Sequence, residues 1–519
     1  MRKLCYLICL MLMFQLTNGQ MSSEPYFYSP IRVTNPRTWK SDNGKITESK
    51  LTVRPKGLYS QIDLELTFAA HKPHIFVDDT LEITFSFNLP EHSFVTDSWL
   101  WVNGVPERAK LLDLSLASAT YENIVNRRKD PSLLTTYGGN NYNLSIYPMM
   151  PLESRKVKIT YMVLNQWSKE EIKAPLPLNI LGGAYGMDKV FSKKVDIELI
   201  NTNRWENVRL SQKTNAQNYV ERQAYVFGFV PEDEFNLVFD SPLKNGIYSR
   251  KFEVGGQGYF EMAFMPEDIL DFSSSGTFTH FDLHTGLTNG ITFDKSYFDS
   301  EIVNPKSDEV ILQTGSYKGT GDLRITAAGE LHKNIYSKAS TINTISSTDT
   351  TIKKIWVNQK IQRLSSELNG GYYWYYGSGG DTGKYNRIQK EIVKLSLENR
   401  ILCNHTAFLA LEPGMQLCYS CVQNTNWGGV PVSNASMVAS DVRLPYASYS
   451  GVNGNNFSLT VNSFNVKTEG EGNLRLENVL LFPNPSTDYI RILLSGENID
   501  SKQYKVIVSD SYGKEIKTM

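Results

Sequence analysis

The chain has 519 residues, enough for about three folded units, and a 41% hydrophobic share that can build real cores and excludes wholesale disorder. With 53 basic and 54 acidic residues, it has no net field that would draw it to nucleic acid or to an anionic membrane. Its many Tyr, Asn, Ser and Gly residues favour a β-rich protein with polar loops.

The first residues predict a secretory signal peptide over residues 1–19. Arg2 and Lys3 precede a solid apolar run over 4–16, and small or polar residues follow up to Gly19. The run is too short to cross a bilayer, and a buried helix would show apolar periodicity instead of a block. No later stretch is long and apolar enough for a span, so we expect an exported chain without a membrane span.

The next region predicts a sandwich of strands with one inserted helix. Apolar residues alternate with polar ones over 61–68, 81–87, 142–146 and 157–161. Between the second and third of these runs, Ser115 is a candidate N-cap of a helix. One face of that helix would carry Ala117, Tyr121, Ile124 and Val125. The helix should end before Asp130-Pro131.

Several motifs of this region occur in the order found in a known family. They are Phe85-Ser-Phe-Asn-Leu-Pro90, Val102-Asn-Gly104, Ala119-x-Tyr121-x-x-Ile124, Asp130-Pro-Ser-Leu-Leu134, Gly139-Asn-Asn-Tyr142, Tyr147-Pro148 and Arg155-Lys-Val-Lys-Ile-Thr-Tyr161. Together they resemble the VIT domain, named for vault protein and the heavy chains of inter-α-trypsin inhibitor. The resemblance covers a core over 55–165, within a first unit expected over 25–245. It implies a β-sandwich-like fold that acts as a non-catalytic interaction or scaffolding module.

In that family a von Willebrand factor A domain usually follows, and it binds a divalent cation through Asp-x-Ser-x-Ser. Asp271, Ser273 and Ser275 match this motif, and their oxygens would suit Mg²⁺. The surrounding sequence, however, alternates like strands and lacks the helices of an α/β domain, on which the other ligands would lie. We therefore expect 246–309 to be a remnant or connector where the A domain would sit.

A second candidate metal site lies on an expected strand over 277–285. His280, Asp282 and His284 would project from one face of that strand, and two imidazoles with a carboxylate can form an open metal triad. Polar residues also alternate outward on any half-exposed strand, which needs no metal. No metal or other cofactor is expected, but the triad defines a rival hypothesis of a metal-dependent secreted enzyme.

The resemblance resumes over 310–421. Leu312-Gln-Thr-Gly-Ser-Tyr317, Leu323-Arg-Ile-Thr326, a helix over 355–364 containing Trp356, a helix over 392–401 and a strand from Thr406 look like the segment that follows the A domain in VIT proteins. The chain thus resembles a VIT protein from which the A domain is missing.

Between the two helices lies a glycine-flanked aromatic segment made of Tyr372, Tyr373, Trp374, Tyr375 and Tyr376. As a loop it could stack on sugar rings or form a contact surface. The alternative is a hairpin whose alternate aromatic residues pack on a neighbouring sheet. This segment is the only candidate ligand contact in the sequence.

Three cysteines remain after removal of the predicted signal peptide, namely Cys403, Cys418 and Cys421. The lone C-x-x-C has neither a second pair nor a nearby His to complete a zinc site, and no βαβ context for a redox site. In an oxidising compartment we expect a local bridge or one to Cys403.

The C-terminal end predicts a sorting signal. After a Ser-, Asn- and Gly-rich linker over 422–472, the motif Phe482-Pro-Asn-Pro-Ser-Thr-Asp488 and the turn Asp510-Ser-Tyr-Gly-Lys514 resemble the type A sorting domain of the type IX secretion system of Bacteroidota. That resemblance implies transport across the outer membrane. The family's small β-sandwich continues past this turn, so we expect 473–519 to be a truncated module with unpaired edges.

These observations predict a mainly β chain with a few helices, of the α+β class. The expected function is that of a secreted or cell-surface, non-catalytic interaction, adhesion or scaffold protein. Its partners would be a surface protein or glycan and the type IX secretion machinery, with no nucleic acid. A degenerate gene product without a retained role is a further alternative, for which a lost A domain and a clipped C-terminus are both expected.

Overall fold

The computed structural model describes residues 30–76, 79–126, 131–177, 195–202, 205–211, 217–219, 222–227, 236–270, 275–288, 294–297, 304–319, 321–375, 382–419, 421, 475–482, 491–497, 507–509 and 515–518. Strands dominate and helices are few, which confirms the predicted mainly β, α+β class. The predicted signal peptide and linker lie outside the described residues. Among the helices of the described part, none has the length and apolar character of a membrane span.

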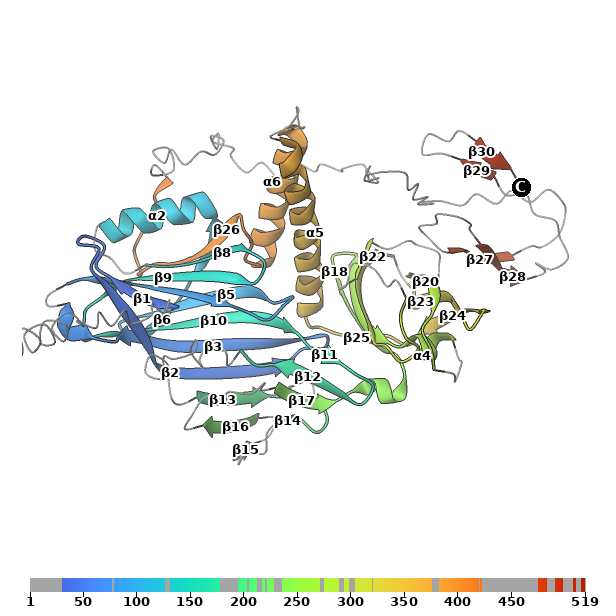
Figure 1. Cartoon of the computed structure of the whole chain (residues 1–519), viewed down its shortest axis with the longest axis horizontal. Helices are drawn as coiled ribbons and strands as arrows, with labels where there is room; N and C mark the ends of the chain where they lie inside the picture. Colours follow the sequence, from blue (N-terminus) through green and yellow to red (C-terminus); the bar gives the residue numbers. More distant parts are fainter. Residues whose placement is uncertain are drawn as a thin grey trace, which may run out of the picture.

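In the described residues, 14 strands join one large sheet (Figure 1). They are β1 (Ile31–Thr34), β2 (Ser41–Pro55), β3 (Tyr59–Ala70), β4 (Leu81–Asn88), β5 (Phe94–Val102), β6 (Val105–Arg108), β7 (Lys110–Asp113), β8 (Ser132–Gly138), β9 (Asn141–Met149), β10 (Ser154–Leu164), β13 (Val195–Ile200), β15 (Gln217–Tyr219), β16 (Arg222–Phe227) and β26 (Thr406–Ala410). The main path is antiparallel and runs β6-β5-β10-β3-β2-β1-β4-β9-β8-β26-β7. Strand β13 joins β2 in parallel and carries β16 and β15. The predicted strands coincide with β3, β4, β9 and β10.

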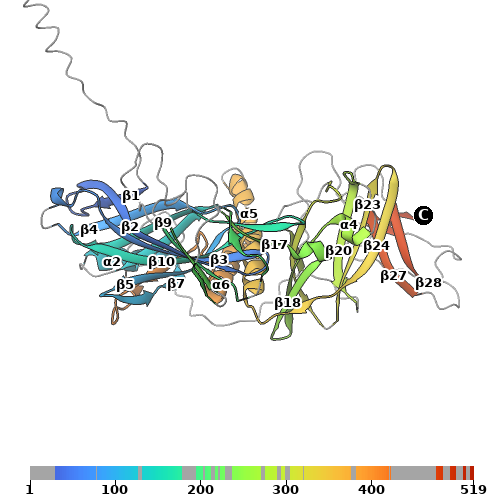
Figure 2. The same ribbon diagram turned by 90° about the horizontal axis from the view of Figure 1, so that it is seen from below.

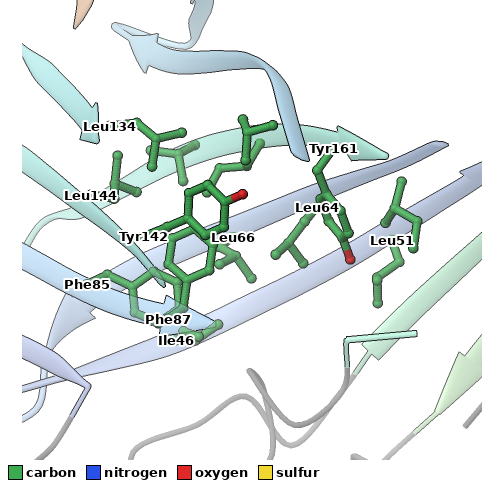
Figure 3. Close-up of a cluster of buried hydrophobic side chains, with 14 of the residues drawn as sticks. Ile46, Leu51, Leu64, Leu66, Phe85, Phe87, Leu134, Tyr142, Leu144 and Tyr161 are labelled. Atoms are coloured by element: carbon green, nitrogen blue, oxygen red, sulfur yellow. The ribbon is translucent and has the colours of Figure 1, made fainter. Parts of the chain in front are cut away.

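The large sheet folds over on strand β2, so that its apolar faces meet. The first residues of β2 pair with β1, and its remainder pairs with β3 from Gly44 onward, with a bulge between Ile46 and Glu48. Alternate residues of each strand then face one another in a common core (Figure 3). Leu64, Leu66 and Phe85 are each at most 1% exposed. This core explains why the period of two was so clear in the sequence.

Helix α2 (Leu114–Asn126) covers the β8–β26 part of this sheet. Ala117 and Tyr121 pack against Ala407 and Leu409 of β26. The helix begins two residues earlier than a cap at Ser115 would place it. Its cap is Asp113, whose Oδ1 accepts hydrogen bonds from the Ser115 backbone N at 2.9 Å and from the Ser115 hydroxyl at 2.5 Å. Asp113 rather than Ser115 takes the N-cap position, because its carboxylate also interacts favourably with the positive end of the helix dipole.

Two further sheets form a second β unit over 248–346. A five-stranded sheet has the order β21-β22-β19-β18-β25, and a three-stranded sheet has the order β20-β23-β24. Their bounds are β18 (Tyr248–Val254), β19 (Gln257–Phe264), β20 (Thr279–Leu287), β21 (Asp294–Tyr297), β22 (Ile311–Lys318), β23 (Leu323–Leu331), β24 (Asn334–Ile342) and β25 (Ile345–Ser346). Short helix α4 (Pro266–Leu270) packs with them around a shared apolar core.

The second β unit differs from the predicted division at residue 310. Strand β19, in the expected connector, pairs along its whole length with β22, which lies beyond that boundary. The two segments share one core, in which Phe260, Phe264 and Ile325 are fully buried. Apolar strands that alternate on both sides of a boundary bury each other's faces, so the connector is part of a folded unit.

Helices α5 (Thr351–Tyr375) and α6 (Thr382–Asn399) form a hairpin between the large sheet and the second β unit in both views (Figures 1 and 2). After α6 the chain returns to the large sheet, where β26 fits between β8 and β7. The predicted post-A-domain region is thus shared between two units.

The remaining strands belong to small sheets. A four-stranded sheet, β11-β12-β17-β14, lies next to the large one, and two C-terminal hairpins fall in the predicted sorting region. The bounds are β11 (Gln166–Trp167), β12 (Glu171–Pro175), β14 (Arg209–Leu210), β17 (Asn236–Asp240), β27 (Arg475–Phe482), β28 (Arg491–Glu497), β29 (Ile507–Ser509) and β30 (Glu515–Thr518). Single turns of 3-10 helix occur at η1 (Pro73–Ile75) and η2 (Pro242–Asn245).

Candidate interaction surfaces

The first candidate metal motif is only partly visible. Asp271 and Ser273 lie outside the described residues, whereas Ser275 is described and its carbonyl oxygen lies 3.4 Å from His332 Nε2. The surrounding residues form the antiparallel sandwich of the second β unit, not the doubly wound parallel sheet on which the remaining ligands of an A domain would lie.

The second candidate, His280, Asp282 and His284, lies on β20 as expected, on the face opposite the buried Phe281 and Leu283. A bulge between Thr279 and Asp282, with φ +57° at His280, changes the direction of the first histidine. His284 Nε2 lies 3.4 Å from Asp282 Oδ2, and His280 Nδ1 lies 3.9 Å from Glu330 Oε2 instead. In the described part of the chain, no three His, Cys, Asp or Glu side chains are grouped to hold a metal ion.

The aromatic segment has a different backbone from both predicted forms. Residues 370–375, which include Tyr372, Tyr373, Trp374 and Tyr375, continue helix α5, and Tyr376 lies outside the described residues. The helix passes through two glycines although each costs about 1 kcal/mol in a helix, and helix α5 as a whole packs against α6. The expectation of a loop or hairpin is therefore wrong for these residues.

The cysteines have the local arrangement. Cys418 and Cys421 form a disulfide, and Cys403 is a free, buried thiol beside the hydroxyl of Thr406. The Cys418 backbone N donates to the Thr120 hydroxyl at 3.1 Å, which ties the disulfide loop to α2.

A polar contact that the sequence did not reveal joins the β2–β3 turn to the second β unit. Arg250 Nη2 donates to the Lys56 carbonyl and to Glu261 Oε1, both at 2.6 Å. The Tyr248 hydroxyl donates to the same Glu261 oxygen at 3.1 Å. Gly57, with φ +98°, leaves so little room that a Cβ there would lie 2.0 Å from Glu261 Oε1. We call this group the turn junction.

Burial governs the electrostatics of the turn junction. Glu261 is 0% exposed, and this burial raises its pKa, although the neighbouring Arg250 opposes the shift. A buried carboxylate paired with a guanidinium costs desolvation energy but becomes strongly destabilising when one partner is removed. The turn junction therefore fixes the relative position of the two units.

A second polar cluster fixes the helical hairpin to the large sheet. Asp97 of β5 accepts from Arg108 Nε at 2.7 Å and from Arg400 Nη2 at 2.7 Å. Arg400 follows α6 with φ +53°, donates to the Ala109 carbonyl at 3.0 Å and lies over the Phe408 ring. We call Asp97, Arg108 and Arg400 the Asp97 cluster.

Trp99 and Trp101 lie on the outer face of the large sheet, where basic side chains from neighbouring strands pack against their rings. Arg108 and Lys158 flank Trp99 across neighbouring strands, at 5.6 and 4.6 Å from its ring centroid. Lys156 lies 4.8 Å from the ring centroid of Trp101. Such cation–π contacts stabilise a half-exposed face. These indoles are engaged by the sheet itself.

One end of the large sheet, by contrast, presents apolar side chains without such cover. Register places Thr34 opposite Ser41, Leu81 opposite Met149 and Ser154 opposite Ala69. The described residues of the three connections, 35–40, 71–76, 79–80 and 150–153, therefore lie at the same end of the sheet, and we call them the loop end. Trp39 is 79% exposed there, Leu152 88% and Met150 42%. The turn junction lies at the opposite end of β2 and β3.

The Trp39 turn is held firmly from within. Asn35 is buried, and its Oδ1 accepts from the backbone N of Arg37 at 2.8 Å and of Thr38 at 3.2 Å. The backbone N of Trp39 donates to the Asn35 carbonyl at 2.9 Å. Trp39 itself has φ +59°, an uncommon conformation for a bulky residue. Asn35-Pro36 is a turn signal in the sequence, but nothing local marks Trp39 as exposed.

Comparison with known families decides the nature of the first unit. Residues 46–161, from within β2 to within β10, match the family model described as vault protein inter-alpha-trypsin domain. This segment is a VIT domain. It lies close to the predicted core over 55–165, and β26 completes the VIT sheet from outside the match.

No curated protein is similar to the chain. Among solved structures, the M1 zinc metallopeptidase of Deinococcus radiodurans aligns with 10% identity and a TM-score of 0.22, over 41% of this chain and 46% of that chain. A mutant of that enzyme with a bound Tyr-Ser-Ala substrate gives 10% identity and 0.21 over the same shares. The chain thus spans less than half the length of these structures, and such low scores carry no argument about fold or activity.

Proposed function

We propose that the protein is a non-catalytic interaction and scaffold protein, displayed at or secreted beyond the cell surface. The observation that carries this proposal is the VIT domain over 46–161, a domain type that mediates protein interactions. Its partner would be a surface protein or glycan. The N-terminal signal pattern and the sorting-type motif near the C-terminus support export by the type IX route, with the chain as a VIT protein lacking its A domain.

The geometry supports a scaffold because polar contacts fix the units to one another. The turn junction holds the second β unit to the tip of β2–β3, and the Asp97 cluster holds the helical hairpin to β5 and β6. The turn junction is buried, with side-chain exposure of 11% for Arg250 and 0% for Glu261. The Asp97 cluster is partly buried, with side-chain exposure of 12% for Asp97, 29% for Arg400 and 51% for Arg108. Rigid placement of surfaces is what a scaffold requires.

A binding experiment tests the proposal. The purified, folded chain is immobilised and incubated with cell-envelope extract and, separately, with a glycan array, while heat-unfolded chain serves as the control bait. We expect at least one protein or glycan to be retained, saturably, by the folded bait alone. Retention of nothing by the folded bait, or of the same set by both baits, would refute the proposal.

The rival enzyme hypothesis has a separate test. Elemental analysis of the purified chain is expected to show no stoichiometric Zn, Fe or Mn. Stoichiometric metal that disappears in His280→Ala would instead favour the metal-dependent enzyme, because it would make His280 a ligand of the metal.

A further inference from the structure

The Asp97 cluster brings two arginines to one carboxylate whose acceptor positions are all used. Asp97 Oδ1 accepts from Arg400 Nη2 at 2.7 Å and from the Ser98 backbone N at 3.0 Å. Asp97 Oδ2 accepts from Arg108 Nε at 2.7 Å, and Arg108 Nη2 lies 2.5 Å from the same oxygen. A carboxylate has about four acceptor positions, so Asp97 cannot serve a further cation.

A third cation, Lys354, lies in the first turn of α5 next to this cluster. In the same turn, Ile355 shares a buried apolar core with Phe94 of β5 and with Ile401, the residue after Arg400. This packing holds the start of the helix close to the strand and to the arginine. In the part of the chain that the structure describes, Lys354 has no carboxylate within ion-pair distance, and Arg400 Nε is buried without a hydrogen-bond partner.

The charges of the cluster act on Lys354. Burial lowers the pKa of this half-buried ammonium, Asp97 and Asp349 oppose the shift, and Arg400 and Arg108 add to it. Two like charges so near to a partly desolvated cation are unfavourable. Three cations therefore share a single carboxylate that is already fully used by two of them.

The acidic side chains around these cations already have cations of their own. The pairs are Asp349–Lys56 at 3.4 Å, Asp63–Arg54 at 2.7 Å, Glu65–Lys156 at 2.8 Å and Glu398–Lys394 at 3.9 Å. Glu107 of β6 stands opposite the buried Leu100 and so lies on the other face of the sheet from Trp99. Lys158, which packs against Trp99 from β10, adds a further cation to the outer face. Among the described residues, the surface around Lys354 thus keeps an excess of positive charge.

We propose that Arg108, Lys354 and Arg400 form a binding site for a phosphate or sulfate group. The three cations come from β6, from the first turn of α5 and from the residue after α6, so their donors do not share one plane. A tetrahedral oxyanion can accept from such donors with three or four oxygens, whereas the two oxygens of a carboxylate lie in one plane. The site is open to solvent, because the side chains of Arg108 and Arg400 are 51% and 29% exposed.

The bound group is either a free ion or an ester carried by a larger ligand such as a glycan. The chemistry that the site recognises is the same in both cases, and the experiment distinguishes the two sources. The site does not depend on the interaction function proposed above.

The test is titration calorimetry and thermal unfolding of the purified full chain with sodium phosphate and sodium sulfate, compared with sodium chloride at equal ionic strength. We expect both oxyanions to bind and to raise the melting temperature above that in chloride, because a ligand that binds only the folded state stabilises it. Glucose 6-sulfate is titrated in parallel. Tighter binding of this ester than of inorganic sulfate supports a site for an esterified group, and equal or weaker binding supports a site for the free ion.

Lys354→Gln is expected to weaken the binding of both oxyanions at least about tenfold, which is the loss of one charge-assisted hydrogen bond. Without added oxyanion this variant should melt at the wild-type temperature or above it, because it breaks no ion pair and removes a cation from beside two arginines.

The matched control is Lys394→Gln, which removes the same charge from a side chain that is 70% exposed and should bind like the wild type. The proposal is overturned if the wild type binds neither oxyanion, if Lys354→Gln binds them as tightly as the wild type, or if Lys394→Gln loses as much binding. A lower melting temperature of Lys354→Gln with unchanged oxyanion binding would assign Lys354 a purely structural role instead.

Discussion

Gly57 shows how much can depend on one missing Cβ. It occupies the β2–β3 turn with a left-handed backbone, and a Cβ added there would lie 2.0 Å from Glu261 Oε1 and 2.5 Å from Arg250 Nη2. Gly104 has a similar φ of +81° in the β5–β6 turn, yet no atom lies within 4 Å of the position of its Cβ. An added Cβ would meet backbone strain at both glycines but a steric clash only at Gly57. Comparing substitutions at the two positions therefore separates these two costs.

Gly57→Ala is expected to lower the free energy of unfolding by more than about 3 kcal/mol, because the methyl group adds a clash with a buried ion pair to the cost of the left-handed backbone. Gly104→Ala should cost only about 1 kcal/mol, since backbone strain is its sole penalty. Urea denaturation of both variants gives the comparison. If both variants lost the same free energy of unfolding, the residues of the turn junction would be shown to move aside for the methyl group at no energetic cost.

His405 provides a pH-dependent contribution to stability. Burial lowers its pKa from 6.5, although Asp113 opposes the shift, and its ring lies 3.5 Å from the Gln389 amide. Below about pH 6.5 the unfolded chain therefore takes up a proton that the folded chain does not, so stability falls as the pH falls through this window. His405→Gln should flatten the dependence of the melting temperature between about pH 5 and pH 7.5. His74→Gln, at an exposed position, is the control, and an equal flattening there would count against His405.

At the scale of elements, the Asp97 cluster holds the end of the helical hairpin to the VIT sheet through a buried carboxylate that is 12% exposed. Asp97 receives two arginines, one from β6 and one from the end of α6. Exposed ion pairs such as Lys169–Glu267 contribute little by comparison, because water screens them. The docking of α6 therefore depends on Asp97 more than on the many surface charges.

Asp97→Ala is expected to destabilise the chain by about 2 kcal/mol, because it leaves the partly buried Arg400 without its carboxylate, whereas water solvates the half-exposed Arg108. Glu267→Ala, which removes a pair with the exposed Lys169, should destabilise the chain much less, because water screens that pair. Thermal unfolding measures both, and limited proteolysis should show earlier cleavage within α5 and α6 in the first variant alone. Similar losses from the two substitutions would contradict this assignment.

The local pattern of residues predicted individual strands and helices better than it predicted which of them pair or pack together. Alternation located β3, β4, β9 and β10 because each buries one face, and the family motifs located the VIT domain. The sequence did not predict that α5 continues through residues 370–375, since two adjacent glycines locally favour the end of a helix. Trp39 was missed as well, because exposure depends on what the fold leaves uncovered. The pairing of β26 with β7 and β8 has no signal in neighbouring residues.

At the scale of the whole molecule, β26 makes the VIT sheet depend on a distant segment. All five residues of β26 are buried, and the strand supplies the partner edge for both β8 and β7. A chain truncated after residue 400 should therefore lose cooperative unfolding of the VIT domain, as followed by circular dichroism. Truncation after residue 421 retains β26 and is the control. A sharp, unchanged VIT transition in the shorter chain would show that β26 is dispensable.

The late position of β26 also has a consequence for biogenesis. A chain that is synthesised or threaded across a membrane N-terminus first leaves the β7 and β8 edges open until Phe408 has emerged. Open strand edges pair readily with other chains. Newly made protein should thus be most prone to aggregate when synthesis or passage pauses before β26, and a holding chaperone would act during that interval.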